Sequence, residues 1–176
     1  MQPGGTRCCN ARRYGPFVST SRLEFLAALP RKVVGAGALV TDDLDQVLVV
    51  KPTYKPGWEI PGGCVEHGES AREACGRELT EELGLTVAVS RLLVIEHQTR
   101  PDDKGDSIMF VYDGGSLTTS EDLTLPADEL AEARFVSPLL LAELLPLRLA
   151  RRMEAAIRAR QEETVIELVN GEVHPG

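Results

Sequence analysis

Three glutamates stand close together in one stretch of the sequence, Glu78, Glu81 and Glu82. The surrounding segment, Ser70–Leu83, has the pattern of a helix. At about 100° per residue, Glu78 and Glu82 fall on one line of that helix and Glu81 lies to one side. Like charges at this spacing repel. A hard divalent cation reverses that cost, because Mg²⁺ and Mn²⁺ prefer carboxylate oxygens and keep positions open for water and phosphate.

The ends of this helix are specified by local chemistry. Ser70 is a good N-cap, and Glu73 three residues later completes a capping box. Gly84 suits the left-handed position just after the helix, where Leu85 can make the hydrophobic contact that often follows. Leucines beside the acidic line are expected to anchor the helix on a core.

An ordinary acidic surface helix is the alternative to a metal-binding helix. In that interpretation Arg77 forms i,i+4 ion pairs with Glu73 and Glu81 on a solvated face. The loop before the helix favours the metal interpretation. Gly62 and Gly63 suit a backbone that approaches a metal and a phosphate closely, where there is no room for Cβ.

The spacing across this loop and helix matches a known signature. The specified residues are, in order, Gly63, Glu69, Arg77-Glu78-Leu79, Glu81-Glu82 and Gly84-Leu85. This stretch resembles the Nudix box at every specified position. The preceding residues Trp58-Glu59-Ile60-Pro61-Gly62 are similar to the usual lead-in of that family. A match this complete is far more specific than an isolated glycine motif.

The resemblance implies a role for each of these residues. The implied ligands of Mg²⁺ or Mn²⁺ are the carboxylates of Glu78, Glu81 and Glu82 and the backbone carbonyl of Gly62. The implied catalytic residues are Glu69, Arg77, Glu81 and Glu82. Among these, Arg77 is expected to orient the carboxylates, and Glu69 is expected to support the geometry of the loop.

The resemblance also implies a reaction. Water attacks a diphosphate linkage in a substrate of the form nucleoside diphosphate joined to a further group, such as ADP-ribose, a nucleotide sugar or a nucleoside triphosphate. The metal neutralises developing charge and lowers the pKa of the bound water. It would also explain how a chain with a formal net charge of −8 accepts an anionic substrate.

The general base varies within the family, so it stays open between two sets of carboxylates. One set is in the box, Glu81 or Glu82. The other lies in the loop before a later strand and comprises Asp128, Glu129 and Glu132. For each of these three, a polar surface loop is the alternative. His67 and His97 are interpreted as surface or positioning residues.

Few residues indicate which nucleotide is bound. Trp58 and Arg100 are the substrate-binding candidates, because an indole can stack on a base and a guanidinium can contact phosphate. Further candidates of the same two kinds are Tyr54, Phe110 and Lys104. Packing within the protein, or exposure to water, is the alternative in each case. Pro101 stands roughly where ADP-ribose-cleaving members often carry a proline, but this segment is also typical of a plain turn.

The rest of the chain has to hold this loop and helix in place. The expected strands are Val33–Val40, Val47–Val50, Thr86–Glu96, Ser107–Asp113, Ala133–Val136 and Thr164–Val169. A second long helix is expected from Pro138 to Gln161, with apolar residues at Leu140, Leu144, Leu147, Ala150 and Ile157. This order favours α/β layering with helices on the faces of a sheet. The resemblance implies a Nudix-like α/β/α sandwich, an α+β fold in which a mixed sheet lies between helices.

The chain divides into an extension and a domain. Residues 1–30 are expected to be an N-terminal extension, basic and loosely ordered over residues 1–20. A short helix is expected over Ser21–Leu29, with Ser21 as its cap and Pro30 as its stop. Residues 31–176 are expected to form a single Nudix domain.

Composition excludes several classes of protein. The chain has 43% hydrophobic and 26% charged residues, as soluble globular proteins do. Its acidic charge argues against binding of nucleic-acid backbones, and no apolar run approaches membrane-spanning length. Four cysteines without a C-x-x-C pair argue against a zinc site and favour reduced thiols in the cytoplasm. The expected partner is a small nucleotide-type diphosphate. A homodimer through the second helix is the alternative to packing of that helix on its own sheet.

Two other functions are weighed against hydrolysis. An enzyme similar to isopentenyl-diphosphate isomerase would show a disturbed box and additional metal-binding His and Cys, whereas this box is regular and the chain has three histidines. A catalytically silent Nudix-fold module that senses or binds a nucleotide would have lost box glutamates, and here each one is present.

Overall fold

The protein is described here from a computed structural model that covers residues 21–84, 86–99, 105–118 and 123–174. It divides into two compact units, Met1–Arg31 and Lys32–Gly176. Within the first unit, α1 (Arg22–Ala27) begins at the predicted cap, because Ser21 and Glu24 form a reciprocal capping box. The division of the chain into an extension and a Nudix domain stays a prediction.

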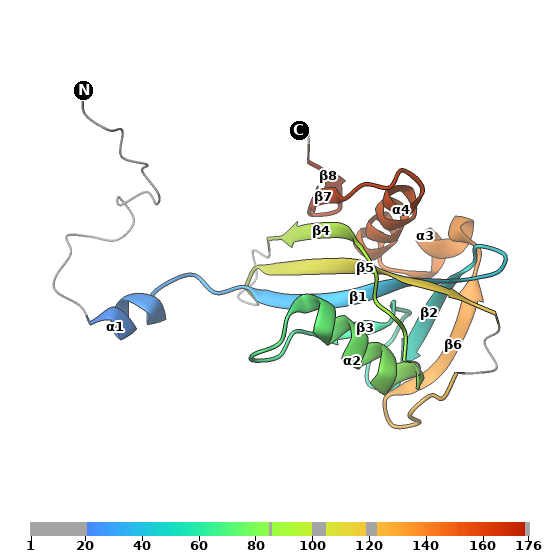
Figure 1. Ribbon diagram of the computed structural model, residues 1–176, viewed down its shortest axis with the longest axis horizontal. Coiled ribbons are helices and arrows are strands. Elements are labelled where there is room, and N and C mark those ends of the chain that lie inside the picture. The colour runs from blue at the N-terminus through green and yellow to red at the C-terminus, as the bar shows by residue number, and fades with distance from the viewer. Residues whose placement is uncertain (1–20, 85, 100–104, 119–122, 175–176) are drawn as a thin grey trace. The chain divides into compact units, whose positions relative to one another are not determined.

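The second unit is built on a mixed sheet that has eight strands within the described residues. The strands are β1 (Val33–Asp42), β2 (Val47–Pro52), β3 (Gly62–Cys64), β4 (Leu92–Gln98), β5 (Ser107–Leu117), β6 (Leu130–Val136), β7 (Ile166–Val169) and β8 (Glu172–Val173). They lie in the order β6-β2-β1-β5-β4-β7-β8, and β3 pairs with β1 beside this path. The β1–β5 and β4–β7 pairs are parallel and the others are antiparallel. Figure 1 shows β1, β5 and β4 side by side at the centre of this sheet.

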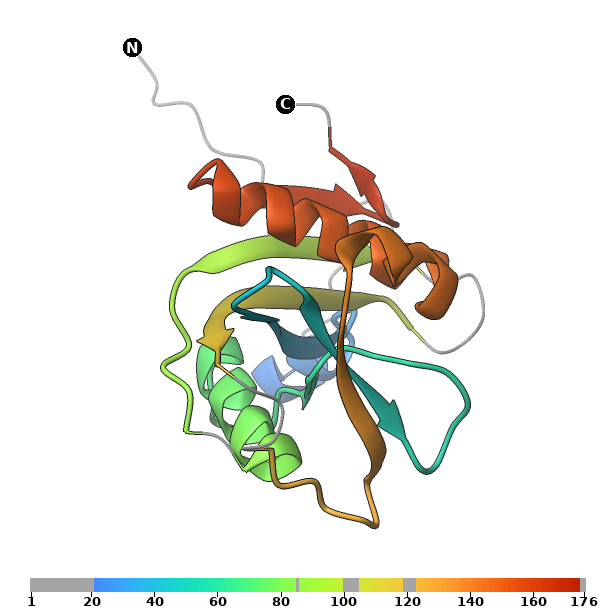
Figure 2. The same ribbon diagram turned by 90° about the vertical axis from the view of Figure 1, so that its right-hand side faces the viewer.

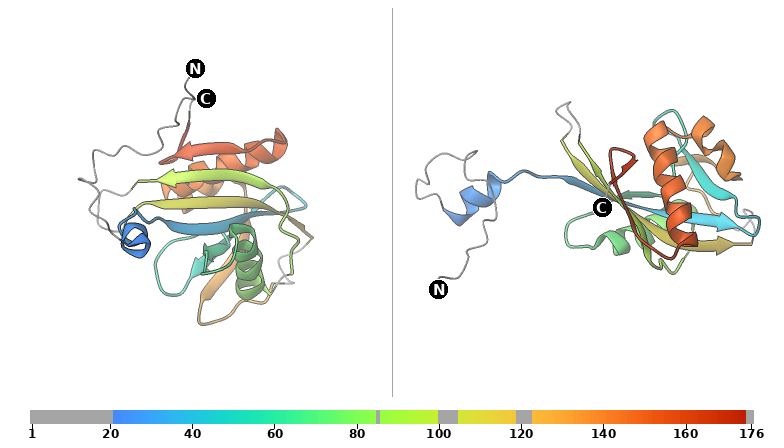
Figure 3. Two further views of the ribbon diagram at one scale, coloured as in Figure 1. Left: turned by 60° about the vertical axis from the view of Figure 1, so that its left-hand side comes forward. Right: turned by 90° about the horizontal axis from the view of Figure 1, so that it is seen from above.

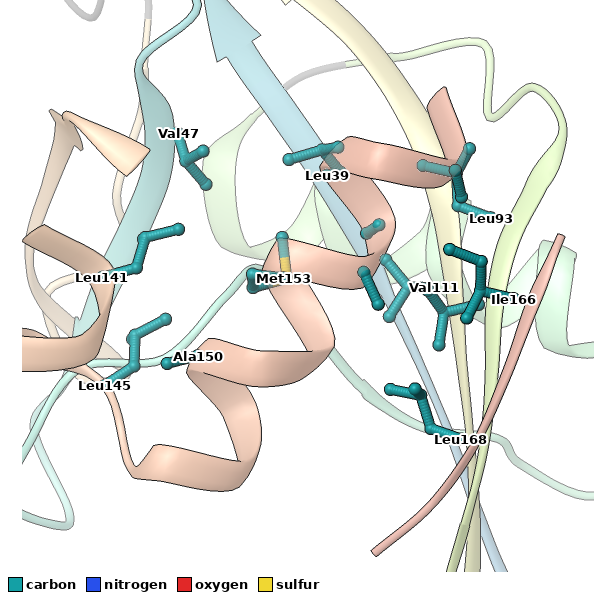
Figure 4. Packing of buried hydrophobic residues seen from close by; sticks show 14 of the residues in the cluster. Leu39, Val47, Leu93, Val111, Leu141, Leu145, Ala150, Met153, Ile166 and Leu168 are labelled. Carbon is teal, nitrogen blue, oxygen red and sulfur yellow. The ribbon is translucent and has the colours of Figure 1, made fainter. Parts of the chain in front are cut away.

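Two hydrophobic cores lie on opposite faces of the sheet, because successive side chains of a strand point to opposite sides. On β1, Leu39 belongs to one core, and Ala38 and Val40 belong to the other. The first core lies under α3 (Leu141–Leu144) and α4 (Leu147–Gln161), and Figure 4 shows its side chains between these helices and the sheet. The second lies under α2 (Ala71–Leu83). Figures 2 and 3 show the two helical layers on either side of the strands, so the predicted α/β/α sandwich is confirmed.

The predicted second long helix, Pro138–Gln161, is not continuous. A short 3₁₀ turn, η2 (Pro138–Leu140), leads into α3, and α4 starts only at Leu147. Pro146 causes the break, since it lacks an N–H and forces Leu145 before it into the extended region, at ψ 152°. As a result Leu140 and Leu147, which were expected on the apolar face, are exposed.

The strand predicted over Thr86–Glu96 begins six residues later, at Leu92. In the segment before it, the Arg72 guanidinium donates to the carbonyl oxygens of Val89 (2.9 Å) and Ser90, while the Ser90 N–H and the Arg91 carbonyl pair with Asp113 of β5. The short strands β3 and β8 were not predicted. Among the described residues, no helix is long and apolar enough to cross a membrane.

Candidate active site

Helix α2 forms where the sequence predicts it, and its two ends are held as expected. The Ser70 hydroxyl accepts from the Glu73 N–H at 3.3 Å, and the Glu73 carboxylate accepts from the Ser70 N–H at 2.7 Å. Gly84 ends the helix in the left-handed region, at φ +68°. The buried face carries Leu79 and Leu83, which turns the three glutamates away from the core. The contact predicted for Leu85 lies outside the described residues.

Strand β3 is joined to the last turn of α2 by one hydrogen bond. The Gly62 N–H donates to Oε2 of Glu82 at 2.8 Å. Gly62 is free to do so because of its register: Ala38 donates to the Pro61 carbonyl and Val65 donates to the Val34 carbonyl. Antiparallel pairs alternate, so Gly62 falls at a non-hydrogen-bonded position opposite Gly37. Its N–H and C=O therefore both face away from β1, toward the helix.

Gly63 brings the backbone of β3 against a second box carboxylate. A Cβ at this position would lie 2.2 Å from Oε1 of Glu78 and 2.5 Å from its carboxyl carbon. No side chain larger than hydrogen fits unless Glu78 moves. A side chain at this position would therefore displace the Glu78 carboxylate, whereas the close approach of Gly62 and Gly63 to a metal and a phosphate stays a prediction.

Arg77 joins the loop to the helix. Its guanidinium pairs with Glu69 (2.8 Å), Glu78 (2.9 Å) and Glu81 (2.9 Å). It also donates to the Cys64 carbonyl oxygen at 3.1 Å. Among the described residues the expected Arg77–Glu81 ion pair forms. The pair of Arg77 with Glu73 does not, because Glu73 is held in the cap of α2.

Burial and charge change the acidity of these carboxyls in opposite directions. Burial raises the pKa of Glu82 to about 7, and the neighbouring charges of Glu78, Glu129 and Glu59 add to the shift. Burial also raises the pKa of Glu78. In contrast, the hydrogen bonds from Arg77 and from the Glu66 N–H lower the pKa of Glu69, which is partly buried. Glu82 and Glu78 are therefore the carboxylates for which a compensating cation is most needed.

Three carboxylates meet around the Arg77 guanidinium, and a fourth, that of Glu82, accepts from the Gly62 N–H, so the group has excess negative charge. Among the described residues, no three His, Cys, Asp or Glu side chains already form a metal-binding group. Glu78 and Glu81 are turned toward Arg77, and Glu82 toward the Gly62 N–H. The donor set nevertheless fits Mg²⁺ or Mn²⁺, because it consists of oxygens, carries excess negative charge and lies against the two glycines Gly62 and Gly63 of β3.

The acidic group opens into a cavity of about 710 Å³ on the second unit. Glu78, Glu59 and Glu129 line one part of it, together with Gly62 and Gly63. Glu59 was not predicted as a site residue. A β-bridge between Glu59 and Val50 holds it at the wall of this cavity. The feature of the sequence that could have indicated Glu59 is its place in the Trp58–Gly62 segment just before the box.

Of the candidate bases in the loop before β6, one lines this cavity, and the two histidines lie outside it. Glu129 lines the cavity, whereas the backbone carbonyl of its neighbour Asp128 accepts from the Thr53 hydroxyl at 2.6 Å. Glu132 is exposed on β6. His67 is exposed in the box loop, and His97 on β4 lies 3.6 Å from Glu167.

The candidates for substrate binding are separated by the structure. Trp58 is half-buried between two cations, with Arg134 at 4.2 Å and Lys51 at 5.9 Å from its ring centroid. Tyr54 is exposed and lines the cavity. Phe110 lies at the cavity wall and stacks on Tyr112 at 6.4 Å. Arg100, Pro101 and Lys104 lie outside the described residues.

Known proteins are similar to this chain in sequence. The NUDIX domain family matches residues 31–160. A Bacillus subtilis protein named "Putative 8-oxo-dGTP diphosphatase" is 36% identical over 104 residues, which are 59% of this chain and 66% of that protein. An ADP-ribose pyrophosphatase of Methanocaldococcus jannaschii is 36% identical over 85 residues, 44% of this chain and 50% of that protein. The chain thus spans about half to two thirds of the length of these two relatives.

Solved structures share the fold. A UDP-X diphosphatase superimposes with a TM-score of 0.65 at 22% identity, covering 85% of this chain and 76% of that chain. A MutT protein from Methanosarcina mazei Go1 gives 0.62 at 23% identity, covering 76% and 96%. The chain belongs to the Nudix hydrolase superfamily.

Proposed function

We propose that this protein is a Mg²⁺- or Mn²⁺-dependent hydrolase that cleaves a diphosphate linkage in a substrate of the form nucleoside diphosphate joined to a further group. The observation that carries the proposal is the junction of β3 and α2. There the Gly62 N–H binds Glu82 at 2.8 Å, and Gly63 lies against Glu78. This junction gathers acidic oxygens at the edge of a cavity large enough for a nucleotide.

The residues that would hold the metal are Glu78, Glu81, Glu82 and the carbonyl of Gly62. When bound, the metal would neutralise phosphate charge and activate a water molecule. The register of β3 supports the role of Gly62, since its carbonyl faces away from β1. Arg77 would keep the carboxylates separated and oriented, because its guanidinium contacts both Glu78 and Glu81.

For proton removal from the attacking water, we favour Glu129 among the carboxylates of the loop before β6. It lines the cavity, and its charge acts on both Glu78 and Glu82. Neither Asp128 nor Glu132 lines this cavity. The box glutamates Glu81 and Glu82 remain the alternative, and the variant that distinguishes them is Glu129→Gln.

The names of the relatives support a nucleotide substrate, of the nucleoside triphosphate or ADP-ribose kind. A second candidate function is binding without hydrolysis. The Nudix domain of Shewanella oneidensis NrtR, which shares the fold with a TM-score of 0.61 at 18% identity, was solved in complex with ADP ribose, so this fold can hold such a nucleotide. The complete set of carboxylates around Arg77 supports the enzyme instead.

The test is a panel of ADP-ribose, nucleoside triphosphates, dinucleoside polyphosphates and nucleotide sugars, each incubated with the protein and Mg²⁺ or Mn²⁺, with identification of both products. We expect hydrolysis of at least one class, and its loss when EDTA replaces the metal. Inactivity across the whole panel, together with nucleotide binding in a direct titration, would establish the binding module in place of the enzyme.

A further inference from the structure

The cavity extends from the acidic group to a buried arginine on α4. Arg152 lines the cavity, and its side chain is only 7% exposed. It comes from the same face of α4 as Leu149, three residues earlier, which also lines the cavity. A long charged side chain is rarely buried unless it is paired or serves a ligand.

Arg152 forms an ion pair with Glu96, but only one of its N–H donors takes part. Its Nε–H donates to Oε2 of Glu96, a fully buried glutamate on β4. The second carboxylate oxygen, Glu96 Oε1, is buried without a hydrogen-bond partner in the described structure. A guanidinium and a carboxylate usually form two parallel hydrogen bonds. Here the terminal nitrogens of Arg152 do not bind Glu96, and among the described residues they have no other hydrogen-bond partner.

The wall beside these nitrogens is apolar. Ile60 lies against Gly37, where a Cβ would come within 3.0 Å of its Cδ1, and Met109 lies against Gly35, where a Cβ would come within 2.5 Å of its Cε. The two glycines of β1 let these side chains lie flat over the strand. Together with Leu149 they give this part of the cavity walls suited to a planar ring.

Charge also separates the two ends of the cavity. Glu96 balances Arg152, so the far end carries no net charge. At the near end Lys55 pairs with Glu59 at 2.8 Å, and Glu78 and Glu129 leave that end acidic. Phosphates belong at the near end with a metal. The far end suits an uncharged group that offers hydrogen-bond acceptors to a guanidinium.

We propose that Arg152, positioned by Glu96, selects a nucleobase with a carbonyl acceptor, and that the protein therefore prefers guanine over adenine nucleotides. Guanine presents two adjacent acceptors, O6 and N7, to a guanidinium, whereas adenine replaces the first with an N6–H₂ donor. The adenine amino group would face the N–H groups of Arg152 and leave a buried donor unpaired.

Ser107 adds a second polar group to the same end of the cavity. It lines the cavity, and its hydroxyl donates to Oε1 of Gln98 at 3.1 Å. On the sheet, Ser107 pairs with Gln98, and Met109 pairs with Glu96. Ser107 therefore lies two residues along β5 from the residue opposite Glu96. With its proton directed to Gln98, its oxygen is left to accept a base N–H, which guanine offers beside its carbonyl.

This inference rests on the proposed function, but its test does not require catalysis. Guanosine 5′-monophosphate and adenosine 5′-monophosphate are titrated into the full chain in EDTA by isothermal titration calorimetry. We expect roughly tenfold to hundredfold tighter binding of the guanine nucleotide, which is the discrimination that a good two-point contact gives. Equal affinities, or tighter binding of the adenine nucleotide, would overturn the proposal.

Variants locate the preference. Arg152→Lys keeps a cation beside Glu96 but removes the planar fork, so the affinity ratio should fall toward one while the affinity for the adenine nucleotide changes little. Arg158→Lys, at an exposed position of the same helix, is the matched control and should keep the ratio. A wild-type ratio in Arg152→Lys would disprove the assignment. If circular dichroism shows that this variant is unfolded, the double variant Glu96→Gln/Arg152→Gln, which replaces the ion pair by a neutral pair, decides the point in the same way.

The proposed hydrolysis and the proposed base selection by Arg152 can be disproved independently. Guanine preference in EDTA with no hydrolysis across the substrate panel would remove the proposed enzyme and leave Arg152 as a base-selecting residue. Hydrolysis of the panel without any base preference would remove the role of Arg152 and leave the enzyme.

Discussion

The Gly62 backbone N–H donates to Oε2 of Glu82 at 2.8 Å, and this hydrogen bond joins the short strand β3 to the last turn of α2. The bond places a half-buried carboxylate beside a backbone carbonyl that faces the same way. Both groups are oxygen donors of the kind that a hard divalent cation binds. The first prediction follows from this pair.

Replacement of Glu82 by glutamine should leave the fold intact and reduce Mg²⁺- or Mn²⁺-dependent hydrolysis by about a hundredfold or more, since a lost metal contact removes several kcal/mol of transition-state stabilisation. The measurement is kcat with the best substrate of the panel. Glu154→Gln, at an exposed position of α4, is the control and should be fully active. Unchanged activity in Glu82→Gln would remove Glu82 from the metal site.

The stability of the metal-free protein should fall as the pH rises from about 5 to about 7.5. Burial raises the pKa of Glu82 to about 7, from a usual value of 4.5. The folded state therefore holds a proton that the unfolded chain has already released, and its stability is lost as the pH rises through the folded-state pKa. Urea unfolding in EDTA at several pH values measures this slope. Glu82→Gln should make it shallower, and an identical slope in the variant would contradict the assignment.

Replacement of Gly63 by alanine should weaken metal binding by roughly tenfold to a hundredfold, as loss of support for a metal ligand commonly does. The new Cβ would overlap the carboxylate of Glu78, at 2.2 Å from Oε1. Titration with Mn²⁺ measures the affinity. The control is Gly76→Ala in α2, where the nearest atom, in Val89, is 3.7 Å away. Equal Mn²⁺ affinity in both variants would show that Gly63 has no part in placing Glu78.

The break before α4 predicts different costs for two nearby leucines. Leu141 is fully buried in the first core, whereas Leu139 is 88% exposed. Leu141→Ala should lower the free energy of unfolding by about 2–5 kcal/mol, because it leaves a cavity. Leu139→Ala should change it by about 0.5 kcal/mol or less. Denaturant unfolding compares them, and similar losses would favour one continuous helix with both leucines on its packed face.

The sequence by itself determined α2 and its chemistry. Both caps of that helix depend on residues within a few positions of each other, so Ser70, Glu73 and Gly84 were enough to specify its ends. The spacing of the box glutamates on a helix is equally local. The layered fold followed from the order of apolar segments, and the pairing of Arg77 with Glu81 followed from helical periodicity.

Only the tertiary structure decided the contacts between segments that are distant in sequence. The hydrogen bond of Gly62 to Glu82 depends on the register of β3 against β1, and β3 is too short to give a pattern of its own. Arg152 and Glu96 are ordinary charged residues in the sequence, and they meet because α4 packs across β4. The hydrogen bonds of Arg72 to the carbonyl oxygens of Val89 and Ser90 likewise join segments that the sequence pattern does not connect. Local chemistry therefore determines the helix that carries the acidic site, while packing over the sheet determines which residues form the rest of the cavity.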